Sequence, residues 1–274
     1  MIRGFLAAVF LFLMTAAAAA VFQWRDSQGN YHFSDRPLAA DAAVLQLERR
    51  PRYHQVAYIY DGDTVRLADG RKVRLLNINT PEIETERKRG EPGGEAAKRQ
   101  LETLLEGRRV RLEYDVERHD KYGRTLAYLF RHDGLHVNLQ LVALGWAIAN
   151  IHPPNLKYAD AILEAQQQAE QARRGIWGMD AYAPKPIEIL RRKRLHGWQR
   201  LVGVPKAVKP GRKYVRLSFA ADLYVTIPRA NLRWFPPLES YLGHRVEVRG
   251  WPSRRGRQHS ILVRHPSALI VLDR

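Results

Sequence analysis

The sequence predicts a mainly β protein with some α-helix, an α+β fold class. Runs of alternating apolar and polar residues at 54–60 and 65–67 lie on either side of the polar residues 61–64, and a period of two is typical of half-buried strands. The last third of the chain carries four or five more short strand-like runs separated by turn residues. At 274 residues, the chain is long enough to form more than one core.

The N-terminus has the pattern of an export signal. Arg3 precedes an apolar run from 5 to 14, and a string of alanines ends at Ala20. We expect residues 1–20 to be a signal peptide, which makes the protein periplasmic or secreted. The alternative is an uncleaved anchor facing outward, because the apolar stretch from 4 to 22 is almost long enough to span a bilayer. The sequence has no cysteine, which excludes disulfides and thiolate chemistry.

Residues 21–50 are expected to form a small β module, with two short aromatic strands around a turn at 27–30. The segment resembles DUF4124, a small domain without assigned chemistry that begins many exported proteobacterial proteins. We expect a cap or a protein-contact module.

The middle of the chain, residues 54–180, mixes hairpins with helices. After the hairpin around Asp69-Gly70, the pattern predicts a helix from 95 to 106 that ends at Gly107. The remaining elements expected here are strands at 110–116 and 125–130, a short helix at 138–144 and an amphipathic helix at 157–174.

Residues 201–274 are expected to form a second, smaller β domain after a basic linker at 181–200. Short strands at this spacing, with a non-strand insert near 231–242, predict a small closed barrel of the OB type. The strands expected are 201–204, 214–219, 223–227, 245–250 and 260–263.

The positive charge is concentrated in this last third. Residues 181–274 hold 20 Lys and Arg against 5 Asp and Glu, a net charge of +15, whereas residues 1–180 hold 25 against 23, a net charge of +2. Such a surface attracts a polyanion, and a basic OB barrel with exposed aromatic residues is a platform for single-stranded nucleic acid. The candidate stacking residues are Tyr214, Phe219, Tyr224, Trp234 and Trp251.

Four groups in the middle domain suit phosphodiester hydrolysis. This reaction needs positively charged groups next to the phosphoryl oxygens and a base that activates a water molecule. Asp63 and carbonyl groups near 79–80 can ligate a hard cation. Arg74 has a fork that fits two phosphate oxygens, and Glu82 can hold a water molecule. Arg124, at the end of a tight turn, presents a second guanidinium group. Each group alone also fits an ordinary turn or a solvated surface, so the argument depends on their occurring together.

In this order, the sequences D-G-D-T (61–64), R-L-L-N-I-N-T-P-E (74–82) and D-K-Y-G-R (120–124) closely resemble the hallmarks of the staphylococcal nuclease (thermonuclease) family. The resemblance implies an OB-like five-stranded barrel with three helices. It also implies Ca2+-dependent cleavage of DNA or RNA that leaves 3′-phosphate products.

The resemblance assigns roles to individual residues. Asp63, Asn79 and the Thr80 carbonyl match the calcium ligands, and Glu82 matches the residue usually described as the general base. Arg74 and Arg124 match the two arginines that grip the phosphate. Lys121 and Tyr122 match residues beside the bound nucleotide's phosphate.

Two positions depart from the family pattern. Asn79 stands where the family has Asp, so the metal site holds one negative charge fewer, and Asp61 is expected to compensate through a water molecule. Asn150 and His152 stand where the family has two nucleotide-packing tyrosines. Base stacking is therefore expected to be weaker there, and the basic C-terminal domain is expected to supply affinity.

We therefore expect an exported Ca2+-dependent nuclease acting on DNA, RNA or both, without an organic cofactor. One alternative is a catalytically weak or inactive nucleic-acid-binding protein on a nuclease scaffold. A second is a basic protein that binds polyanions of the cell envelope. The sequence leaves the choice between DNA and RNA, and the oligomeric state, open.

Overall fold

The computed structural model describes residues 22–44, 51–86 and 89–272. Its contacts divide the chain into a small unit ending at Pro51 and a large unit from Arg52 to Arg274. The predicted signal peptide, 1–20, lies outside the described residues. Within the described part of the chain, no helix is both long enough and apolar enough to cross a membrane.

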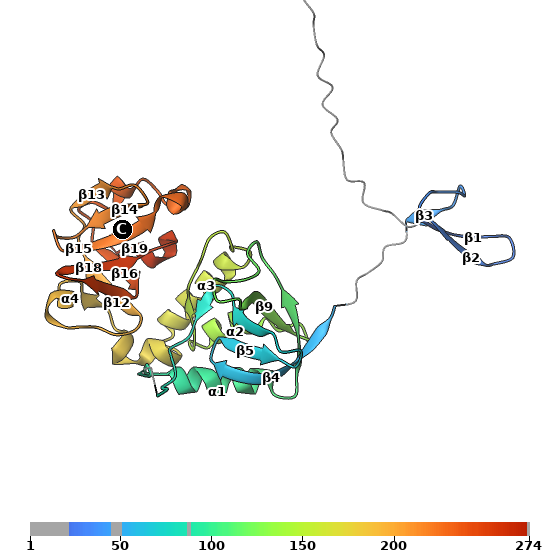
Figure 1. The fold of residues 1–274 in the computed structure, drawn as a ribbon, viewed down its shortest axis with the longest axis horizontal. Coiled ribbons are helices and arrows are strands. Elements are labelled where there is room, and N and C mark those ends of the chain that lie inside the picture. The colour runs from blue at the N-terminus through green and yellow to red at the C-terminus, as the bar shows by residue number, and fades with distance from the viewer. Residues whose placement is uncertain (1–21, 45–50, 87–88, 273–274) are drawn as a thin grey trace, which may run out of the picture. The chain divides into compact units, whose positions relative to one another are not determined.

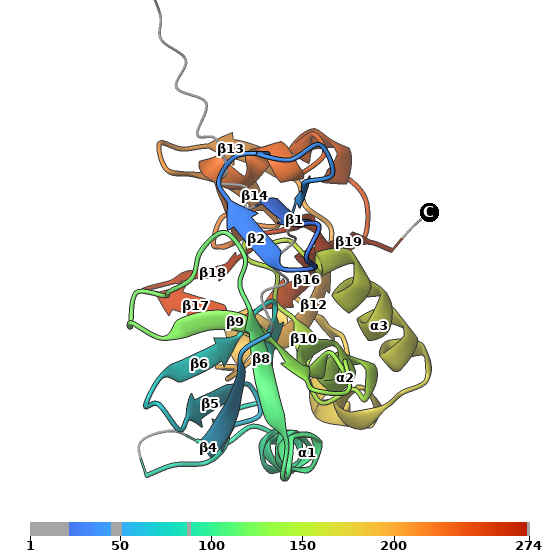
Figure 2. The same cartoon turned by 90° about the vertical axis from the view of Figure 1, so that its right-hand side faces the viewer.

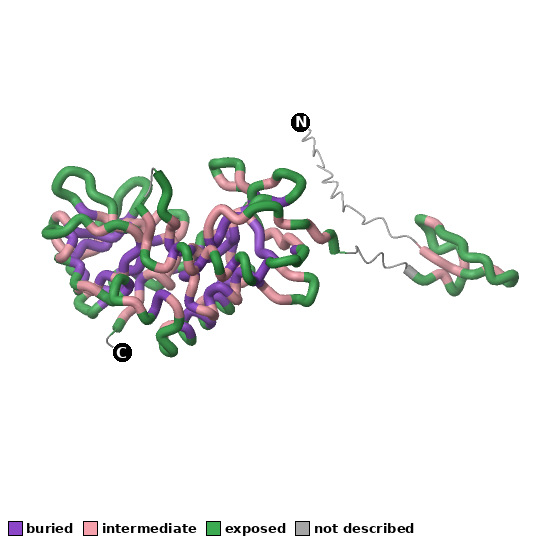
Figure 3. Tube along the Cα trace, turned by 90° about the horizontal axis from the view of Figure 1, so that it is seen from below, coloured by how far each residue is buried: buried purple, intermediate pink, exposed green. Residues whose placement is uncertain are grey.

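The small unit is an antiparallel sheet with strand order β2-β1-β3. β1 (Phe22–Arg25) and β2 (Tyr31–Ser34) are the two expected aromatic strands, and β3 (Ala43–Val44) pairs with the other edge of β1. None of the residues described from 22 to 43 is buried (Figure 3). The aromatic side chains of this hairpin therefore stay on its surface instead of forming a core.

A closed five-stranded barrel forms the first half of the large unit, with strand order β4-β5-β6-β9-β8 (Figure 1). Its neighbouring strands are antiparallel except β6 and β9, which run parallel. The predicted α+β class and the OB-like barrel are confirmed. The strands are β4 (Tyr53–Asp61), β5 (Thr64–Leu67), β6 (Lys72–Leu75), β8 (Arg109–Glu113) and β9 (Thr125–Arg131).

Three helices accompany the barrel, with α1 beside β4 and α2 packed on α3 (Figure 2). They are α1 (Gly94–Leu105), α2 (Val137–Ala143) and α3 (Ala159–Gln171), each within a few residues of its predicted position. Leu101, Leu141 and Ile162 are fully buried, because apolar residues three and four apart share one helix face. Two short strands, β7 (Ile78–Asn79) and β10 (Ile148–Ala149), pair beside the barrel.

The C-terminal strands form two sheets, with orders β11-β12-β16-β19 and β13-β14-β15-β18-β17. Both sheets enclose a single core that includes Leu201, Leu217, Val225, Val248 and Ile261. The first sheet consists of β11 (Lys185–Pro186), β12 (Gln199–Gly203), β16 (Val246–Gly250) and β19 (Leu269–Val271). The second consists of β13 (Ala207–Pro210), β14 (Tyr214–Ser218), β15 (Leu223–Pro228), β17 (Pro252–Arg255) and β18 (Gln258–Leu262).

The two C-terminal sheets are joined by two bent strands. β12 continues into β13 after residues 204–206, and β16 continues into β17 after Trp251. If each bent strand is counted as one, the C-terminal strands pair in the same order as those of the first barrel. β15 and β18 are the parallel pair, and the pairing of β12 with β16 completes the ring. The predicted OB-like strand order is present, although the bends divide the pairs into two sheets instead of one continuous barrel.

The segment 181–200, expected to be a linker, is built into the C-terminal domain. It contains β11 and the short helix α4 (Ile189–Arg192), and Ile187 and Leu190 are buried in the C-terminal core. Trp198 packs instead with Trp177 of the first half of the large unit, with ring centroids 5.9 Å apart. The two halves therefore share apolar contacts through this segment.

A buried cluster of charges also joins the two halves. Glu170, on α3, accepts hydrogen bonds from Arg249 Nη1 at 2.5 Å and Nη2 at 2.9 Å. Arg249 Nε donates to Glu247 Oε1 at 2.6 Å, and Arg200 Nε donates to the same oxygen at 2.8 Å. Glu247 is only 2% exposed, so this cluster is screened from water.

Candidate active site

Asp63 lies in a two-residue turn that aims its side chain inward. Asp61 and Thr64 pair at the ends of β4 and β5, which leaves Gly62 and Asp63 at the turn. Asp63 is 5% exposed, and its Oδ1 accepts a hydrogen bond from the Thr64 hydroxyl group at 2.9 Å. A Cβ at Gly62 would lie 2.7 Å from Thr80 Cγ2, so only glycine lets the turn approach Thr80 this closely. The D-G-D-T sequence thus forms a turn in which the side chain of Asp63 is buried.

Arg74 is the centre of the polar cluster. Its cross-strand partner on β5 is Thr64, which places its guanidinium group beside Asp63, with Nη2 at 3.0 Å from Asp63 Oδ2. Nη2 also donates to Asn79 Oδ1 at 2.9 Å, and Nη1 donates to the Leu75 carbonyl at 2.8 Å. The plane of the guanidinium group is therefore fixed by three acceptors.

A left-handed residue brings Asn79 and Thr80 to the same place. Asn77 has a φ of +59°, and its side chain donates to the Tyr128 hydroxyl group at 2.8 Å and the Asn155 carbonyl at 3.0 Å. The chain then turns into β7, and Thr80 N donates to Asp63 Oδ2 at 2.9 Å. Asn79 Nδ2 donates to the Thr80 carbonyl at 2.8 Å. The three predicted metal-ligating residues therefore lie in one cluster.

The chemistry of these donors fits a hard cation. Burial and the charge of Asp63 raise the pKa of Asp61 to about 6, and a cation beside this pair of carboxyl groups would favour their ionised forms. The Thr80 carbonyl and the Asn79 amide add neutral oxygen ligands of the kind that Ca2+ accepts. No site with three Asp, Glu, His or Cys side chains occurs among the described residues, so such a cation would need these neutral ligands.

Glu82 lies where the loop after β7 meets the start of α1. Its backbone carbonyl accepts a hydrogen bond from Glu91 N at 2.8 Å, and its backbone N–H donates to Glu91 Oε2 at 3.3 Å. A Cβ at Gly94 would lie 2.3 Å from the Glu82 carbonyl oxygen. The position of Glu82 is thus set by backbone contacts with the N-terminus of α1.

Arg124 closes the turn that precedes β9. The carboxylate of Asp120 accepts from the backbone N–H groups of Tyr122 and Arg124 and from Arg124 Nε, the last at 2.6 Å. Arg74 pairs with Leu126 across β6 and β9, so Arg124, two residues earlier, projects from the same face of the sheet as Arg74. Asp120 thus positions the second arginine, a role that the sequence signalled only through the D-x-x-x-R spacing of the turn.

The other predicted nucleotide contacts are on the surface of this turn. Tyr122 is 72% exposed, and Lys121 Nζ lies 4.9 Å from the centre of its ring. An exposed tyrosine next to a lysine suits contact with a nucleotide that lies outside the barrel.

The predicted stacking residues of the C-terminal domain separate into two groups. Phe219 and Tyr224 are 4% and 9% exposed, so they belong to the core. Tyr214, Trp234 and Trp251 are 45%, 38% and 37% exposed and remain available at the surface.

Comparisons with known proteins agree with this geometry. Residues 72–179 match the family described as staphylococcal nuclease homologue, and residues 8–56 match the domain of unknown function DUF4124. The thermonuclease of Staphylococcus intermedius is 35% identical over 170 residues, which cover 61% of this chain and 94% of that protein. The thermonuclease of Staphylococcus hyicus is 35% identical over 127 residues, covering 45% and 75% of the two chains. Endonuclease YncB of Bacillus subtilis is 36% identical over 127 residues, covering 44% and 60%.

The protein has a closed barrel that carries two arginines and a buried carboxylate, and its relatives are nucleases. It is therefore a nuclease that hydrolyses phosphodiester bonds. The chain belongs to the staphylococcal nuclease family, and a DUF4124 module precedes its nuclease domain.

Proposed function

We propose that this protein is an exported, Ca2+-dependent nuclease that cleaves DNA, RNA or both and leaves 3′-phosphate ends. The observation that supports the calcium dependence is the cluster of Asp63, Asn79 and Thr80 around Arg74, next to a second carboxyl group, Asp61, whose Oδ1 accepts a hydrogen bond from Asp63 N at 3.0 Å.

In this proposal, Asp63, Asn79 Oδ1 and the Thr80 carbonyl hold Ca2+, which would supply positive charge to the phosphoryl oxygens. Arg74 and Arg124 bind the other phosphoryl oxygens and stabilise the charge that develops on them. Glu82 orients the attacking water molecule and accepts its proton. Lys121 and Tyr122 contact the nucleotide beside the scissile phosphate.

Export is proposed from the sequence of residues 1–20. The mass of the protein recovered from the periplasm or medium tests it, since a mature chain that begins near Val21 is expected. A full-length mass in the membrane fraction would instead support an anchor.

The activity is tested by cleavage of single-stranded DNA and RNA at increasing Ca2+ concentrations. The wild-type protein is compared with the double variant Glu82→Gln/Arg124→Ala, which we expect to lose at least about a thousandfold in kcat because it lacks both the base and a phosphate-binding arginine. Mass spectrometry of the products then identifies the end that carries the phosphate.

A suitable control is Glu102→Gln/Arg108→Ala, which makes the same changes at exposed residues on and just after α1 that are not predicted site residues. It is expected to cleave as the wild type does. Cleavage in EDTA, or an unchanged rate in the Glu82→Gln/Arg124→Ala variant, would contradict the proposal.

A further inference from the structure

A small hollow lies where the nuclease half meets the C-terminal domain. Asn150, His152 and Gln166 line it from the nuclease side, and Trp251, Arg264 and His265 line it from the C-terminal side. Its volume is about 30 Å³, room for roughly one water molecule, so a larger ligand has to lie across its opening.

This hollow adjoins the candidate active site through β10. Ile148 pairs with Asn79, and Asn150 N donates to the Asn77 carbonyl at 2.8 Å. The next residues of the chain, up to His152, therefore continue from the predicted metal ligand toward the C-terminal domain. These are the positions at which the family's nucleotide-packing tyrosines are replaced.

Arg264 is a half-buried guanidinium group for which the described residues provide no hydrogen bond or ion pair. Burial lowers its pKa, and the electrostatic effect of Tyr214 offsets this only in part. His152 is exposed overall, but its ring is desolvated by the surrounding walls, and the charges of Arg264 and then Arg74 further lower its pKa, to about 4. His152 thus lies within electrostatic reach of both arginines. Asp63 offsets the charge of Arg74, so an anion placed there would be attracted mainly by Arg264.

A second hollow, of about 320 Å³, begins on the other side of Trp251. Trp251 lines both hollows, and its indole ring is 37% exposed without a ring or cation–π partner among the described residues. No Asp or Glu lines either hollow. The charged and titratable residues that line the second one are Lys193, Arg194, His196, Arg254 and His259.

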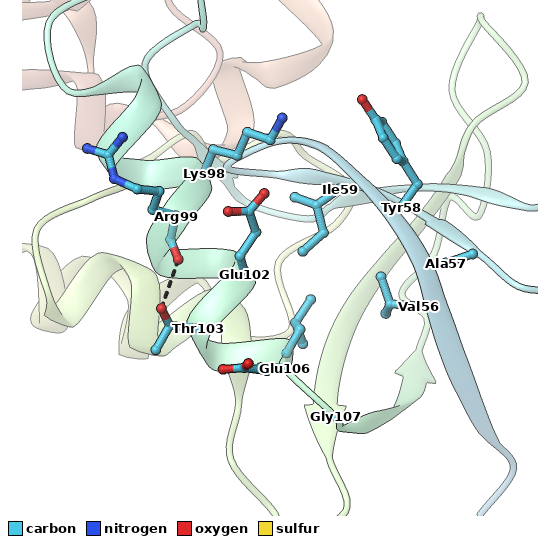
Figure 4. A pocket seen from close by; sticks show the side chains of 11 residues that line it. Val56, Ala57, Tyr58, Ile59, Lys98, Arg99, Glu102, Thr103, Glu106 and Gly107 are labelled. Atoms are coloured by element: carbon cyan, nitrogen blue, oxygen red, sulfur yellow. Dashed lines mark hydrogen bonds between the residues drawn. The ribbon is translucent and has the colours of Figure 1, made fainter.

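A third, larger groove on the described surface has a mixed lining of acidic and basic residues. It has a volume of about 620 Å³ and lies between β4 and α1, where Lys98 and Arg99 are followed along the chain by Glu102 and Glu106 (Figure 4). Mixed charges of this kind give little net attraction for a phosphate chain. The hollows on both sides of Trp251 are smaller, but every Arg, Lys, Asp or Glu that lines them is an arginine or a lysine. In the first hollow, Glu170 and Glu247 offset the charge of Arg249.

We infer that the C-terminal domain extends the substrate site of the proposed nuclease with a subsite for single-stranded polynucleotide. Arg264 binds a phosphate next to the scissile one, and Trp251 stacks on a base as the strand passes into the basic hollow beyond it. Guanidinium groups and aromatic faces are the two elements of sequence-tolerant single-strand binding. The buried Glu170–Arg249–Glu247–Arg200 cluster holds both sides of the junction in place, so the subsite is formed before the substrate arrives.

Binding measured without cleavage tests this inference independently of the proposed chemistry. A fluorescein-labelled 12-nucleotide DNA strand is titrated in EDTA, by fluorescence anisotropy, at several salt concentrations. Arg264→Gln is expected to weaken binding roughly tenfold and to reduce the salt slope by about 0.7, the value for one phosphate contact on a single strand. Arg212→Gln makes the same change at an exposed turn of the same domain, outside both hollows, and serves as the matched control.

The stacking contact is tested by Trp251→Ala and Trp251→Phe. Loss of base stacking is expected to weaken binding roughly tenfold in Trp251→Ala, and the phenyl ring of Trp251→Phe is expected to restore most of it. If Arg264→Gln matches Arg212→Gln in both affinity and salt slope, the phosphate contact is refuted. Equal weakening in Trp251→Ala and Trp251→Phe would refute stacking.

Cleavage then separates a failure of the subsite from a failure of the proposed function. For wild-type protein, kcat/KM is measured on the 12-nucleotide strand and on a dinucleotide, and Arg264→Gln is expected to lower the ratio of the two values about tenfold. A wild-type protein that binds the strand but cleaves neither substrate would overturn the proposed function and leave the subsite standing. An unchanged ratio in an active Arg264→Gln variant would overturn the subsite.

Discussion

Asn79 is the residue at which the site of this chain departs from the pattern of its family. Its amide group serves two partners, because Oδ1 accepts from Arg74 and Nδ2 donates to the Thr80 carbonyl. A carboxylate could keep the first contact but not the second. The substitution therefore removes a negative charge and also engages a carbonyl oxygen that the proposed Ca2+ site needs.

Restoring the acid is expected to strengthen the metal site. Asn79→Asp adds a charge and frees the Thr80 carbonyl, so the Ca2+ concentration for half-maximal cleavage should fall roughly tenfold. Gln167→Glu adds the same charge at an exposed position of α3, outside the proposed ligand set and both hollows, and serves as the control. Equal shifts in the two variants would show that only the general electrostatic potential had changed.

The meeting of Asp63, Arg74 and Thr80 was predictable in part from sequence, because a hairpin joins the first two, whereas their roles were inferred from the family resemblance. Asp63 and Arg74 come together through the hairpin, and Thr80 follows from the next short strand. Arg264 was not predictable, because it lies 112 positions after His152 and reaches the hollow only through the packing of two domains. No periodicity in either segment reports such a contact.

At the scale of elements, helices and strands with a strong hydrophobic periodicity were predicted at the right positions, and elements with a weak periodicity were missed. The predicted helix 95–106 appears as α1, Gly94–Leu105, and the C-terminal run at 223–227 appears as β15. β7 and β10 were not predicted, since two residues are too few to show alternation. β17 was also missed, because its sequence P-S-R-R has no apolar face.

The N-terminus of α1 controls the position of Glu82, and Gly94 is the residue that permits their contact. Gly94→Ala puts a methyl group against the backbone of Glu82, which no side-chain movement can relieve. We expect a loss of about 1–3 kcal/mol in the free energy of unfolding and a fall in kcat of at least about tenfold at saturating Ca2+.

Thermal unfolding and cleavage rates measure these two effects of Gly94→Ala separately. Arg99→Ala, at an exposed position on the same helix, is the control and is expected to change neither by much. A stable Gly94→Ala variant with normal kcat would show that Glu82 does not depend on this contact.

At the scale of the whole molecule, the buried charge cluster couples two domains that share an OB-like strand order. Burial opposes the ionisation of Glu247, but hydrogen bonding to Arg200 and the charges of Arg249 and Arg200 outweigh it and lower its pKa below the ordinary 4.5. The contribution of this ionised group to stability is complete above about pH 4.5. It disappears as the pH falls through the lowered pKa of the folded state.

Glu247→Gln is expected to cost about 3 kcal/mol of unfolding free energy at pH 7, because it leaves two arginines without their shared carboxylate. The difference from wild type should shrink below pH 4.5, where the native glutamate becomes protonated. Urea denaturation at pH 7 and at lower pH values measures both effects. Glu239→Gln, on the exposed turn before β16, is the control, and a pH-independent difference for Glu247→Gln would contradict the argument.

The apolar contacts of Trp198 have a consequence for dissecting this protein. A chain shortened to end at residue 180 would lose Trp198 and uncover Trp177, and Glu170 would face solvent without Arg200 and Arg249. We expect this fragment to be aggregation-prone and poorly soluble, although it would contain every proposed catalytic residue. The smallest portion of this chain that behaves as a well-formed enzyme is therefore expected to be residues 52–274, more than twice the length of its family match.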